Sequence, residues 1–360
     1  MPRYRQFQQT NVLEEARIRM RHIYDTFDNV TCMFSGGKDS LSVLYLAREV
    51  GRELGYKRVR AVFRDEEFIH QETVDFITEL REREADWLDL EWWAVPMLSV
   101  SYVLTETKRV LFWDPDREWA RQPPDFALRA ADLGLPEGVV IEQHNADHLT
   151  CRGQRGRVAL VTGVRAAESI QRYRACVNKL SENYIVASQA KQAALVRPIF
   201  DWSDDDVFRF IYDLGIQYCP IYDHQLWGGA ALRTSTAVNP QAAKVLHHLE
   251  GYDPELYERM IDVLPDMAVQ RRYWAEYDAK GILDRYSTSW DQIEAWVLQA
   301  YSTPDQTAKA LDCLAATRIR ADISPGAYPL RYVLQSLMRQ SGRRDILPLK
   351  PKEAAAYGPD

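Results

Sequence analysis

The sequence predicts an α/β fold, a parallel sheet with helices on both faces, followed by a helical C-terminal region. Short apolar runs rich in β-branched residues alternate with amphipathic segments in the first half of the chain. A glycine-rich turn, MFSGGKDS at residues 33–40, joins the first apolar run to a helical segment. Beyond about residue 225 the pattern is helical, with breaks at proline and glycine. Alternating strands and helices are typical of a parallel sheet covered by helices.

The first elements are read from periodicity and from residues that end helices and strands. Apolar residues at helical spacing predict helices, and short β-branched runs predict buried strands. A glycine, Gly51 or Gly55, is expected near the end of the second helix. The predicted elements, in chain order, are a helix over 11–27, a strand over 30–34 (VTCMF), a helix over 39–50, a strand over 59–63 (VRAVF), a helix over 73–83 and a strand over 88–96.

The pattern loosens between residues 99 and 149, where Trp, Pro and Asp are frequent, and we interpret this segment as an insertion or lid. VALVTGV at 158–164 predicts another buried strand. DWSDDDVFRFIYDLG predicts a helix that begins at Ser203 or Asp204 and ends before Gly215. The expected domains are therefore an α/β domain over 1–225, with the insertion at about 99–149, and a helical region over 226–360.

Composition excludes several classes of protein. The chain has 360 residues, of which 46% are hydrophobic and 27% charged, as in ordinary globular proteins. No apolar run approaches the ~18 residues of a membrane span, and the N-terminus has no signal-peptide core, so we expect a cytoplasmic protein with no membrane partner. Its five cysteines form no C-x-x-C pair, which predicts reduced, mostly buried thiols. An iron–sulfur cluster is not expected, although the spacing of the cysteines alone does not exclude that four of them meet in space and bind one.

Charge is distributed unevenly along the chain. The net charge is -7, yet residues 151–197 contain nine Lys or Arg and two acidic residues. A local basic patch in an acidic protein favours a polyanionic small ligand or a single nucleic-acid strand over a long duplex. Chance clustering on a solvated surface is the alternative.

The glycine-rich turn has the chemistry of a phosphate-binding loop. Adjacent glycines allow close backbone approach to phosphate, hydroxyls donate hydrogen bonds, and lysine balances the charge. Asp39 is a candidate Mg²⁺ ligand through water, or only a partner of the helix dipole. The turn does not fit G-x-x-x-x-G-K-[ST], the P-loop of NTPases. The candidate residues are Ser35, Gly36, Gly37, Lys38, Asp39 and Ser40.

Two other segments are expected at the same edge of the sheet, where ligands bind in open α/β folds. Asp65 and Glu67 follow the second strand and are candidates for ribose or metal contact. The loop after the strand at 158–164 offers arginines for pyrophosphate or a substrate anion, and a glutamate that orients one of them. Its candidate residues are Gly163, Arg165, Glu168, Ser169 and Arg172.

Three weaker patterns have ordinary structural alternatives. Arg152, Arg155 and Arg157 lie on a glycine-containing loop that suits an anion clamp. His144 and His148, spaced for one helix face, could form a zinc site with Cys151, although such pairs are commonly surface residues. Four tryptophans suit base stacking, but core packing or lid closure is favoured; they are Trp92, Trp93, Trp113 and Trp119.

Several motifs resemble one superfamily. SGGKDS is similar to the S-G-G-x-D-S PP-loop of the adenine nucleotide alpha hydrolases, the N-type ATP pyrophosphatases. VTGVRAAESIQRYR resembles the G-x-R-x-x-E-S-x-x-R segment of the PAPS (3′-phosphoadenylyl sulfate) reductase superfamily, and RPIFDWSDDDVFRFI and CPIYD resemble the stretches that follow it there. The likeness covers roughly residues 28–225. It implies an adenine nucleotide, ATP or PAPS, with Mg²⁺ as cofactor, and Lys38, Asp39 and Arg165 as catalytic residues.

Within that superfamily, the tail ILPLKPKEAAAYGPD has no cysteine where assimilatory reductases carry E-C-G-x-H, which disfavours PAPS reduction. FWDPDREWARQPP and the helical C-terminal half resemble the reductase-like proteins of prophages and mobile elements, of the immunoglobulin-binding-regulator A type. That likeness implies a ParB/sulfiredoxin-like protein partner.

Two functions are favoured, and a third, PAPS reduction through a cysteine supplied by a partner, remains open. One is an enzyme that cleaves ATP between the α and β phosphates to activate an acceptor, with nucleic acid as a candidate. The other is a non-catalytic nucleotide-binding regulator that acts with its partner.

Overall fold

The computed structural model describes residues 9–103, 106–142, 145–168, 170–176, 182–227, 232, 234–238, 246–272, 279–301, 303–340 and 345–357. The chain forms two compact units. Unit 1 comprises Met1–Tyr102 and Thr107–Met267, and unit 2 comprises Val103–Glu106 and Ala268–Asp360. No helix among the described residues has the length and apolar character needed to cross a membrane.

The boundary lies later in the chain than the sequence indicated, because part of the segment after residue 225 packs into unit 1. The Thr236 hydroxyl and the Ala237 N–H both donate to the Phe68 carbonyl, at 3.0 Å each. His70 Nδ1 lies 2.5 Å from Asp253 Oδ2. Helical periodicity carries no information about such long-range contacts, so the sequence assigned this segment to the helical region.

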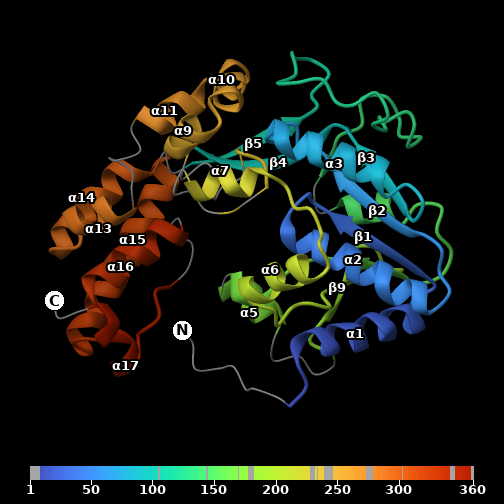
Figure 1. Cartoon of the computed structure of the whole chain (residues 1–360). Helices are drawn as coiled ribbons and strands as arrows, with labels where there is room; N and C mark the ends of the chain where they lie inside the picture. The colour runs from blue at the N-terminus through green and yellow to red at the C-terminus, as the bar shows by residue number, and fades with distance from the viewer. Residues whose placement is uncertain are drawn as a thin grey trace. The chain divides into compact units, whose positions relative to one another are not determined.

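A six-stranded sheet forms the centre of unit 1 (Figure 1), in the order β3-β2-β1-β7-β9-β8. Every neighbouring pair is parallel except β8 and β9. This confirms the predicted mostly parallel sheet flanked by helices. The two short strands β8 and β9 were not predicted. The strands are β1 (Asn29–Phe34), β2 (Val59–Arg64), β3 (Leu88–Trp93), β7 (Val158–Val161), β8 (Ile185–Ala187) and β9 (Ala193–Val196).

The strand order creates a reversal point in the sheet. From β1 the chain moves outward through β2 to β3, and it later returns to the other side of β1 with β7. Loops that follow β1 and β7 therefore diverge in opposite directions at the carboxyl edge of the sheet. Crevices at such points are where open α/β sheets bind ligands.

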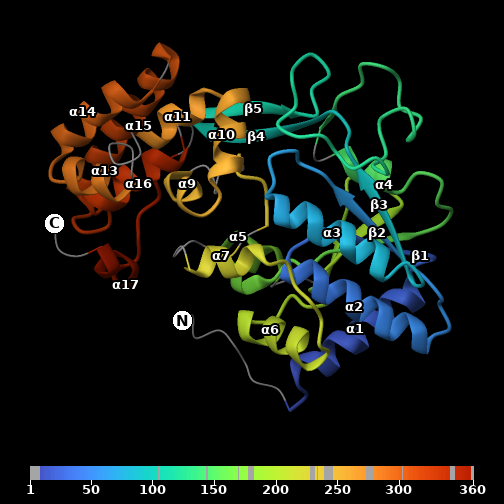
Figure 2. The same cartoon turned by 45° about the horizontal axis from the view of Figure 1, so that its top comes forward.

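Local sequence signals explain the helices that surround the sheet. The Asn11 side chain caps α1 (Val12–Thr26), and Ser203 and Asp206 form a capping box at the start of α6 (Asp204–Asp213). The helix α2 (Lys38–Glu53) follows the glycine-rich turn, and α3 (Gln71–Arg83) follows β2. Figures 1 and 2 both show α2 and α3 side by side over the sheet.

The predicted insertion contains regular structure that the sequence pattern did not reveal. Its strands β4 (Met97–Val103), β5 (Glu106–Phe112) and β6 (Ile141–Glu142) form a separate three-stranded sheet in the order β5-β4-β6. The short helix α4 (Ala146–Thr150) follows. Arg64 of β2 donates to Asp147 and Thr150 of this helix, at 3.0 and 2.9 Å. Polar contacts thus fix this part of the insertion to the sheet.

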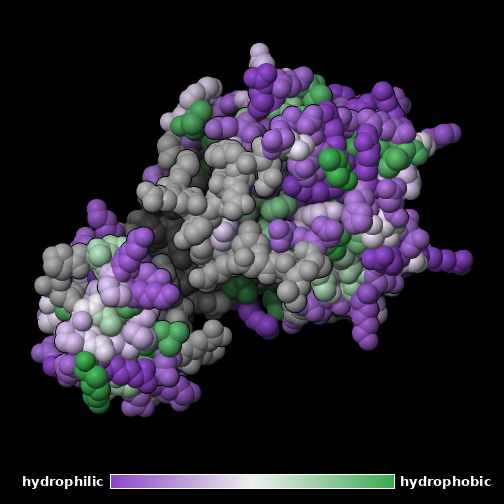
Figure 3. Space-filling view, turned by 90° about the horizontal axis from the view of Figure 1, so that it is seen from below, coloured by the Kyte–Doolittle hydropathy of each residue, from purple (hydrophilic) through white to green (hydrophobic). Residues whose placement is uncertain are grey.

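The remaining elements are helical, as predicted. A buried core that includes Ile293, Val297, Val333 and Leu334 holds unit 2 together. In the space-filling view of Figure 3, hydrophilic residues predominate on the coloured surface. The other helices are η2 (Ala166–Glu168), α5 (Ile170–Cys176), α7 (Ile221–Trp227), η3 (Leu246–His248), α9 (Leu249–Tyr252), α10 (Pro254–Val263), α11 (Asp266–Arg272), α13 (Ala279–Tyr286), α14 (Trp290–Ala300), α15 (Pro304–Ile323), α16 (Leu330–Gln340), α17 (Pro351–Ala354) and η4 (Ala355–Tyr357).

Candidate functional site

Close packing explains the two glycines in the loop between β1 and α2. Gly36 has φ +75°, and a Cβ atom there would lie 2.9 Å from the Ile77 side chain. A Cβ at Gly37 would lie 2.8 Å from the Thr234 hydroxyl oxygen. The loop is thus pressed between α3 and the segment around Thr234, where side chains do not fit.

The loop hydroxyls hold the loop in shape. Ser40 donates to the Gly37 carbonyl at 2.9 Å and accepts from the Ser35 N–H at 3.1 Å. The two hydroxyl oxygens lie 3.0 Å apart. Gly37, the N-cap residue of α2, has no side chain with which to cap the helix, so the N–H groups at its start depend on other partners.

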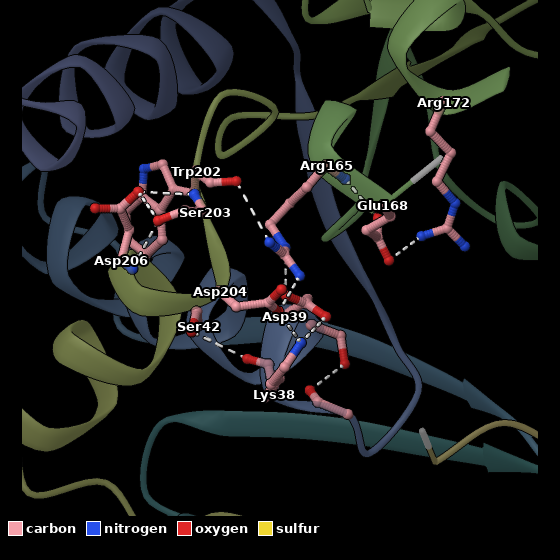
Figure 4. Close-up of polar contacts among 12 residues, drawn as sticks. Lys38, Asp39, Ser42, Arg165, Glu168, Arg172, Trp202, Ser203, Asp204 and Asp206 are labelled. Atoms are coloured by element: carbon pink, nitrogen blue, oxygen red, sulfur yellow. Dashed lines mark hydrogen bonds and ion pairs between the residues drawn. The ribbon is translucent and has the colours of Figure 1, made fainter. Parts of the chain in front are cut away.

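Two cations and two carboxylates converge beside this loop, as Figure 4 shows. We call Lys38, Asp39, Arg165 and Asp204 the loop cluster. Lys38 Nζ lies 3.0 Å from a carboxylate oxygen of Asp39 and 3.0 Å from one of Asp204. Arg165 donates to the same two carboxylates, at 2.6 and 2.8 Å. Each cation therefore contacts both carboxylates.

Arg165 reaches the cluster because β7 pairs with β1. A Cβ at Gly163 would lie 2.6 Å from the Asp39 carbonyl carbon, so glycine lets the loop after β7 contact the start of α2. The Arg165 N–H donates to Glu168 at 2.8 Å, and Glu168 also pairs with Arg172. Arg172 is half exposed and lies away from the cluster in Figure 4, joined to it through Glu168.

The loop cluster is partly enclosed but not sealed. The side chains of Lys38 and Arg165 are 6% and 2% exposed, whereas Asp39 is 21% and Asp204 67% exposed. Burial alone would lower the pKa of Arg165, but Asp39, Asp204 and Glu168 raise it above its ordinary value. Burial opposes ionisation of Asp204, yet Lys38 and Arg165 lower its pKa. Arg165 and Asp204 therefore stay charged at neutral pH.

Tyr222 of α7 closes the other side of the loop. Its hydroxyl oxygen accepts a hydrogen bond from the Lys38 N–H at 2.9 Å. Burial raises the pKa of Tyr222, so the hydroxyl is neutral. This hydrogen bond uses the first backbone N–H of α2, which is a group that can also donate to a phosphate oxygen.

Asp65 and Glu67 lie at the predicted edge of the sheet but inside the protein. Asp65 accepts from Trp92 Nε1 at 2.8 Å and pairs with Arg121. Glu67 accepts two hydrogen bonds from Arg117, at 2.7 and 2.6 Å. Both carboxylates are fully buried, and the insertion covers them. Contact with ribose or metal at these positions stays a prediction, and this arrangement gives both residues a structural role.

Other predicted site residues lie elsewhere or outside the described residues. Ser169 and His144 are outside the described residues, and His148 is exposed. The segment that carries Arg152, Arg155 and Arg157 precedes β7, at the amino edge of the sheet. These arginines therefore lie at the opposite edge of the sheet from the glycine-rich loop, and an anion clamp there stays a prediction. Packing is confirmed for the buried Trp92, Trp93 and Trp113, whereas Trp119 is half-buried.

The cysteines are free, and all but Cys313 are buried, as predicted. Burial raises the pKa of Cys32 to about 12 and that of Cys219 to about 11. Burial also raises the pKa of Cys151. These three thiols are protonated at neutral pH and are poor nucleophiles.

Sequence reasoning missed Asp204, Tyr222 and Thr234 as members of the site. A signal existed for Asp204: once Ser203 and Asp206 cap the helix, Asp204 is the first helical residue, and its side chain is free to point elsewhere. Tyr222 lies in CPIYD, a motif already recognised, but its contact with Lys38 N spans 184 residues. For Thr234 no local pattern indicates the approach to Gly37.

A family model described as the phosphoadenosine phosphosulfate reductase domain matches residues 149–261. The match includes Gly163, Arg165, Asp204 and Tyr222, and it begins after the glycine-rich loop at residues 35–40. It supports the superfamily resemblance over this part of the chain. The more specific likeness to the prophage type stays a prediction.

The relatives are distant. The uncharacterized protein YbdN of Escherichia coli (strain K12) is 28% identical over 239 residues, which are 64% of this chain and 59% of that protein. Among solved structures, the phosphoadenylyl-sulfate (PAPS) reductase of Candida auris is 13% identical, with 64% of this chain and 98% of that chain covered and a TM-score of 0.33. The FMN adenylyltransferase of Candida glabrata, in complex with FAD and inorganic pyrophosphate, is 13% identical, with 66% and 70% covered and a TM-score of 0.39.

Proposed function

We propose that the protein binds the polyphosphate of ATP at residues 35–40 and cleaves it between the α and β phosphates to activate an acceptor. One observation carries the proposal. Lys38 and Arg165 come from the loops after the adjacent strands β1 and β7 and share the same two carboxylates, at 2.6–3.0 Å. They meet at the reversal point of the sheet, where a nucleotide is expected in this type of fold.

The charge of the loop cluster suits a nucleotide that arrives with a metal ion. Two cations and two carboxylates are neutral together, so the cluster alone does not offset a polyphosphate. Asp39 and Asp204 fit Mg²⁺, which proteins commonly hold through one or two carboxylates together with substrate phosphates. Mg²⁺ held there would supply positive charge to the phosphates. Lys38 and Arg165 are placed to donate to phosphate oxygens in place of the two carboxylates.

The proposed reaction is adenylyl transfer. An acceptor oxygen or nitrogen forms a bond to the α phosphorus, while the bond from that phosphorus to the α,β-bridging oxygen breaks. Pyrophosphate leaves with the bonding electron pair, and the proton of the acceptor passes to solvent. Lys38 and Arg165 stabilise the negative charge that grows on the leaving group, which is the main contribution expected of such a site.

Sulfonucleotide reduction has less support. Attack on a sulfuryl group needs a thiolate, and burial keeps Cys32, Cys151 and Cys219 protonated. The loop cluster itself contains no thiol and acts on phosphates through charge. ATP is therefore favoured over PAPS as the substrate.

The test is incubation of α-labelled ATP with purified protein, Mg²⁺ and a cell extract that supplies acceptors. We expect labelled AMP or an AMP-linked adduct, with a rate reduced about 10²–10³-fold in Lys38→Ala and Arg165→Ala because each removes a charge that stabilises the leaving group. Lys57→Ala, an exposed lysine after α2, is the matched control and keeps the wild-type rate.

Two outcomes contradict the proposal. Full cleavage in both Lys38→Ala and Arg165→Ala contradicts the site. Binding of ATP without cleavage, measured by calorimetry, contradicts the reaction and supports the alternative, a nucleotide-gated regulator that acts through a protein partner. Circular dichroism of the variants separates loss of activity from loss of folding.

A further inference from the structure

A second cluster of polar side chains lies in unit 1, away from the loop cluster. It joins the first residues of α3 to the start of α10. His70 is the N-cap residue of α3, Glu72 lies in the first turn of that helix, and Asp253 is the N-cap residue of α10. His70 Nδ1 and Asp253 Oδ2 are 2.5 Å apart, and one ligand atom from each of the three residues lies within 4.8 Å of the others.

The three side chains differ in burial in a way that suits a site open on one side. His70 is 3% and Asp253 10% exposed, whereas Glu72 is 34% exposed and faces water. An imidazole nitrogen and two carboxylates from separate elements thus converge at the surface of the unit. Among the described residues, this is the one group of three or more metal-ligand side chains that gathers in this way.

A neighbouring histidine holds the exposed carboxylate. Nδ1 of His224, on α7, lies 3.2 Å from Glu72 Oε1. Partners of this kind fix the orientation of ligating carboxylates and tune their affinity for the ion. His224 is therefore a positioning residue for Glu72.

We propose that His70, Glu72 and Asp253 bind one divalent transition-metal ion, with Zn²⁺ the best fit. A set of one imidazole and two carboxylates is typical of transition metals, whereas Mg²⁺ prefers oxygen ligands alone. Zn²⁺ binds nitrogen and oxygen at roughly 2.0–2.2 Å, so its ligands lie about 3–3.5 Å apart. The observed separations, from 2.5 Å to at most 4.8 Å, bracket that value and need only small side-chain shifts.

The ion would fasten two distant parts of the chain. Residues 70 and 253 are 183 positions apart, and the His70–Asp253 contact is a link between the start of α3 and the start of α10. Three protein ligands leave a fourth position for water or a further group. This proposal is independent of nucleotide cleavage, because none of its residues belongs to the loop cluster.

Calorimetric titration of the metal-stripped full chain with Zn²⁺, without nucleotide or Mg²⁺, tests the proposal. We expect one ion per chain. His70→Ala abolishes this binding, and Glu72→Gln weakens it at least about tenfold. His22→Ala, an exposed histidine on α1, is the matched control and keeps wild-type affinity.

Glu72→Gln is expected to fold like the wild type, because Glu72 is one-third exposed and glutamine can still form hydrogen bonds there. A loss of Zn²⁺ binding in this variant therefore reports on the site and not on misfolding. Co²⁺ provides a second measurement on the wild-type chain, since four- or five-coordinate Co²⁺ absorbs visible light strongly and aqueous Co²⁺ does not. His224→Ala should shift that absorption band and lower Zn²⁺ affinity about 10–100-fold. Absence of stoichiometric binding, or equal binding in wild type, His70→Ala and Glu72→Gln, overturns the proposal.

Discussion

Two clusters of the same charges lie at the carboxyl ends of neighbouring strands, and they differ in their access to water. The loop cluster follows β1 and β7. The other follows β2, and we call it the turn cluster: Asp65, Glu67, Arg117 and Arg121. Each cluster consists of two cations and two carboxylates. In the loop cluster Asp204 is largely exposed, whereas both carboxylates of the turn cluster are completely buried.

Access to water decides what each cluster can do. A carboxylate that faces solvent can leave its cation when a phosphate arrives, because water replaces the lost hydrogen bonds. A buried carboxylate has no such replacement, and separating it from its arginine leaves an uncompensated charge inside the protein. The comparison indicates that the loop cluster can exchange partners, and that the turn cluster holds the insertion in place.

The backbone supports the same distinction. In the loop cluster, glycines at 36, 37 and 163 allow close approach. In the turn cluster, Glu67 and Trp113 have φ of +60° and +52°, which is strained for residues with side chains. The Trp113 N–H donates to the Glu67 carboxylate at 2.7 Å. This hydrogen bond and the ion pairs of the cluster hold both residues in their strained backbone conformations.

Asp65→Asn is expected to have the largest effect on stability. The Asp65 carboxylate accepts hydrogen bonds from Arg121, from Trp92 Nε1 and from the Glu67 N–H. Asparagine replaces one carboxylate oxygen with an NH₂ group, which cannot accept any of these bonds. We expect the free energy of unfolding to fall by about 3–5 kcal/mol, the cost of breaking a buried ion pair. Urea denaturation followed by circular dichroism measures it.

Asp204→Asn is the matched change in the exposed cluster. Because Asp204 faces solvent, its ion pairs are screened, and we expect a change of at most about 1 kcal/mol. If the two variants lose equal stability, access to water does not distinguish the clusters. If Asp65→Asn is as stable as the wild type, the Asp65 carboxyl is neutral in the folded protein and the turn cluster is misinterpreted.

The sequence predicted the architecture of the sheet well, and also the position of the glycine-rich loop between β1 and α2, because both depend on local signals. Short apolar runs marked β1, β2, β3 and β7, and Ser203 with the acidic residues after it marked the start of α6. The predicted strand ends also placed Arg165 at the correct edge of the sheet, although not its contacts with Asp39 and Asp204.

Long-range contacts account for what the sequence did not reveal. Asp65 and Glu67 had the correct position at the edge, but burial beneath Arg117 and Arg121 depends on how the insertion folds back. Short strands such as β6 carry too few residues for a periodic pattern. The His70–Asp253 contact joins residues from parts of the chain that the sequence had assigned to different domains.

Gly163→Ala tests the close approach between the two loops of the loop cluster. The new Cβ would lie 2.6–2.7 Å from backbone atoms of Asp39 and Ser40, so the backbone must move. We expect a loss of about 1–3 kcal/mol in unfolding free energy, together with weaker ATP binding, because Arg165 and Asp39 move apart. Denaturation and calorimetry measure the two effects.

Gly251→Ala provides the control for that substitution. Gly251 lies in α9, and a Cβ there meets no atom within 4 Å. Alanine should be neutral or stabilise the helix by about 0.5–1 kcal/mol. Unchanged stability and ATP affinity in Gly163→Ala would show that the two loops are not held as closely as the structure indicates.

Glu66 gives a further test of how access to water separates the two clusters. In the sequence it lies between Asp65 and Glu67, which are each paired with an arginine, and its carboxyl group is also buried. Burial raises the pKa of Glu66 from 4.5 to about 7, opposed by a hydrogen bond from the Thr236 backbone and reinforced by the charge of Asp65. Between these pH values the folded protein retains a proton that the unfolded chain has released. Stability therefore falls as pH rises from 4.5 to about 7, and the full cost of ionisation is present above that range.

Glu66→Gln removes the titrating group and should flatten this part of the pH profile, with a gain on the order of 1–2 kcal/mol at pH 8 relative to pH 5. Urea denaturation of the wild type and of Glu66→Gln at pH 5 and pH 8 measures how the unfolding free energy of each changes with pH. The other titrating groups are common to both proteins, so their contributions cancel when the two changes are subtracted. An identical pH dependence would mean that Glu66 is ionised throughout and reaches water. In that case access to solvent extends into the turn after β2, which would support the predicted ligand contact at Asp65 and Glu67.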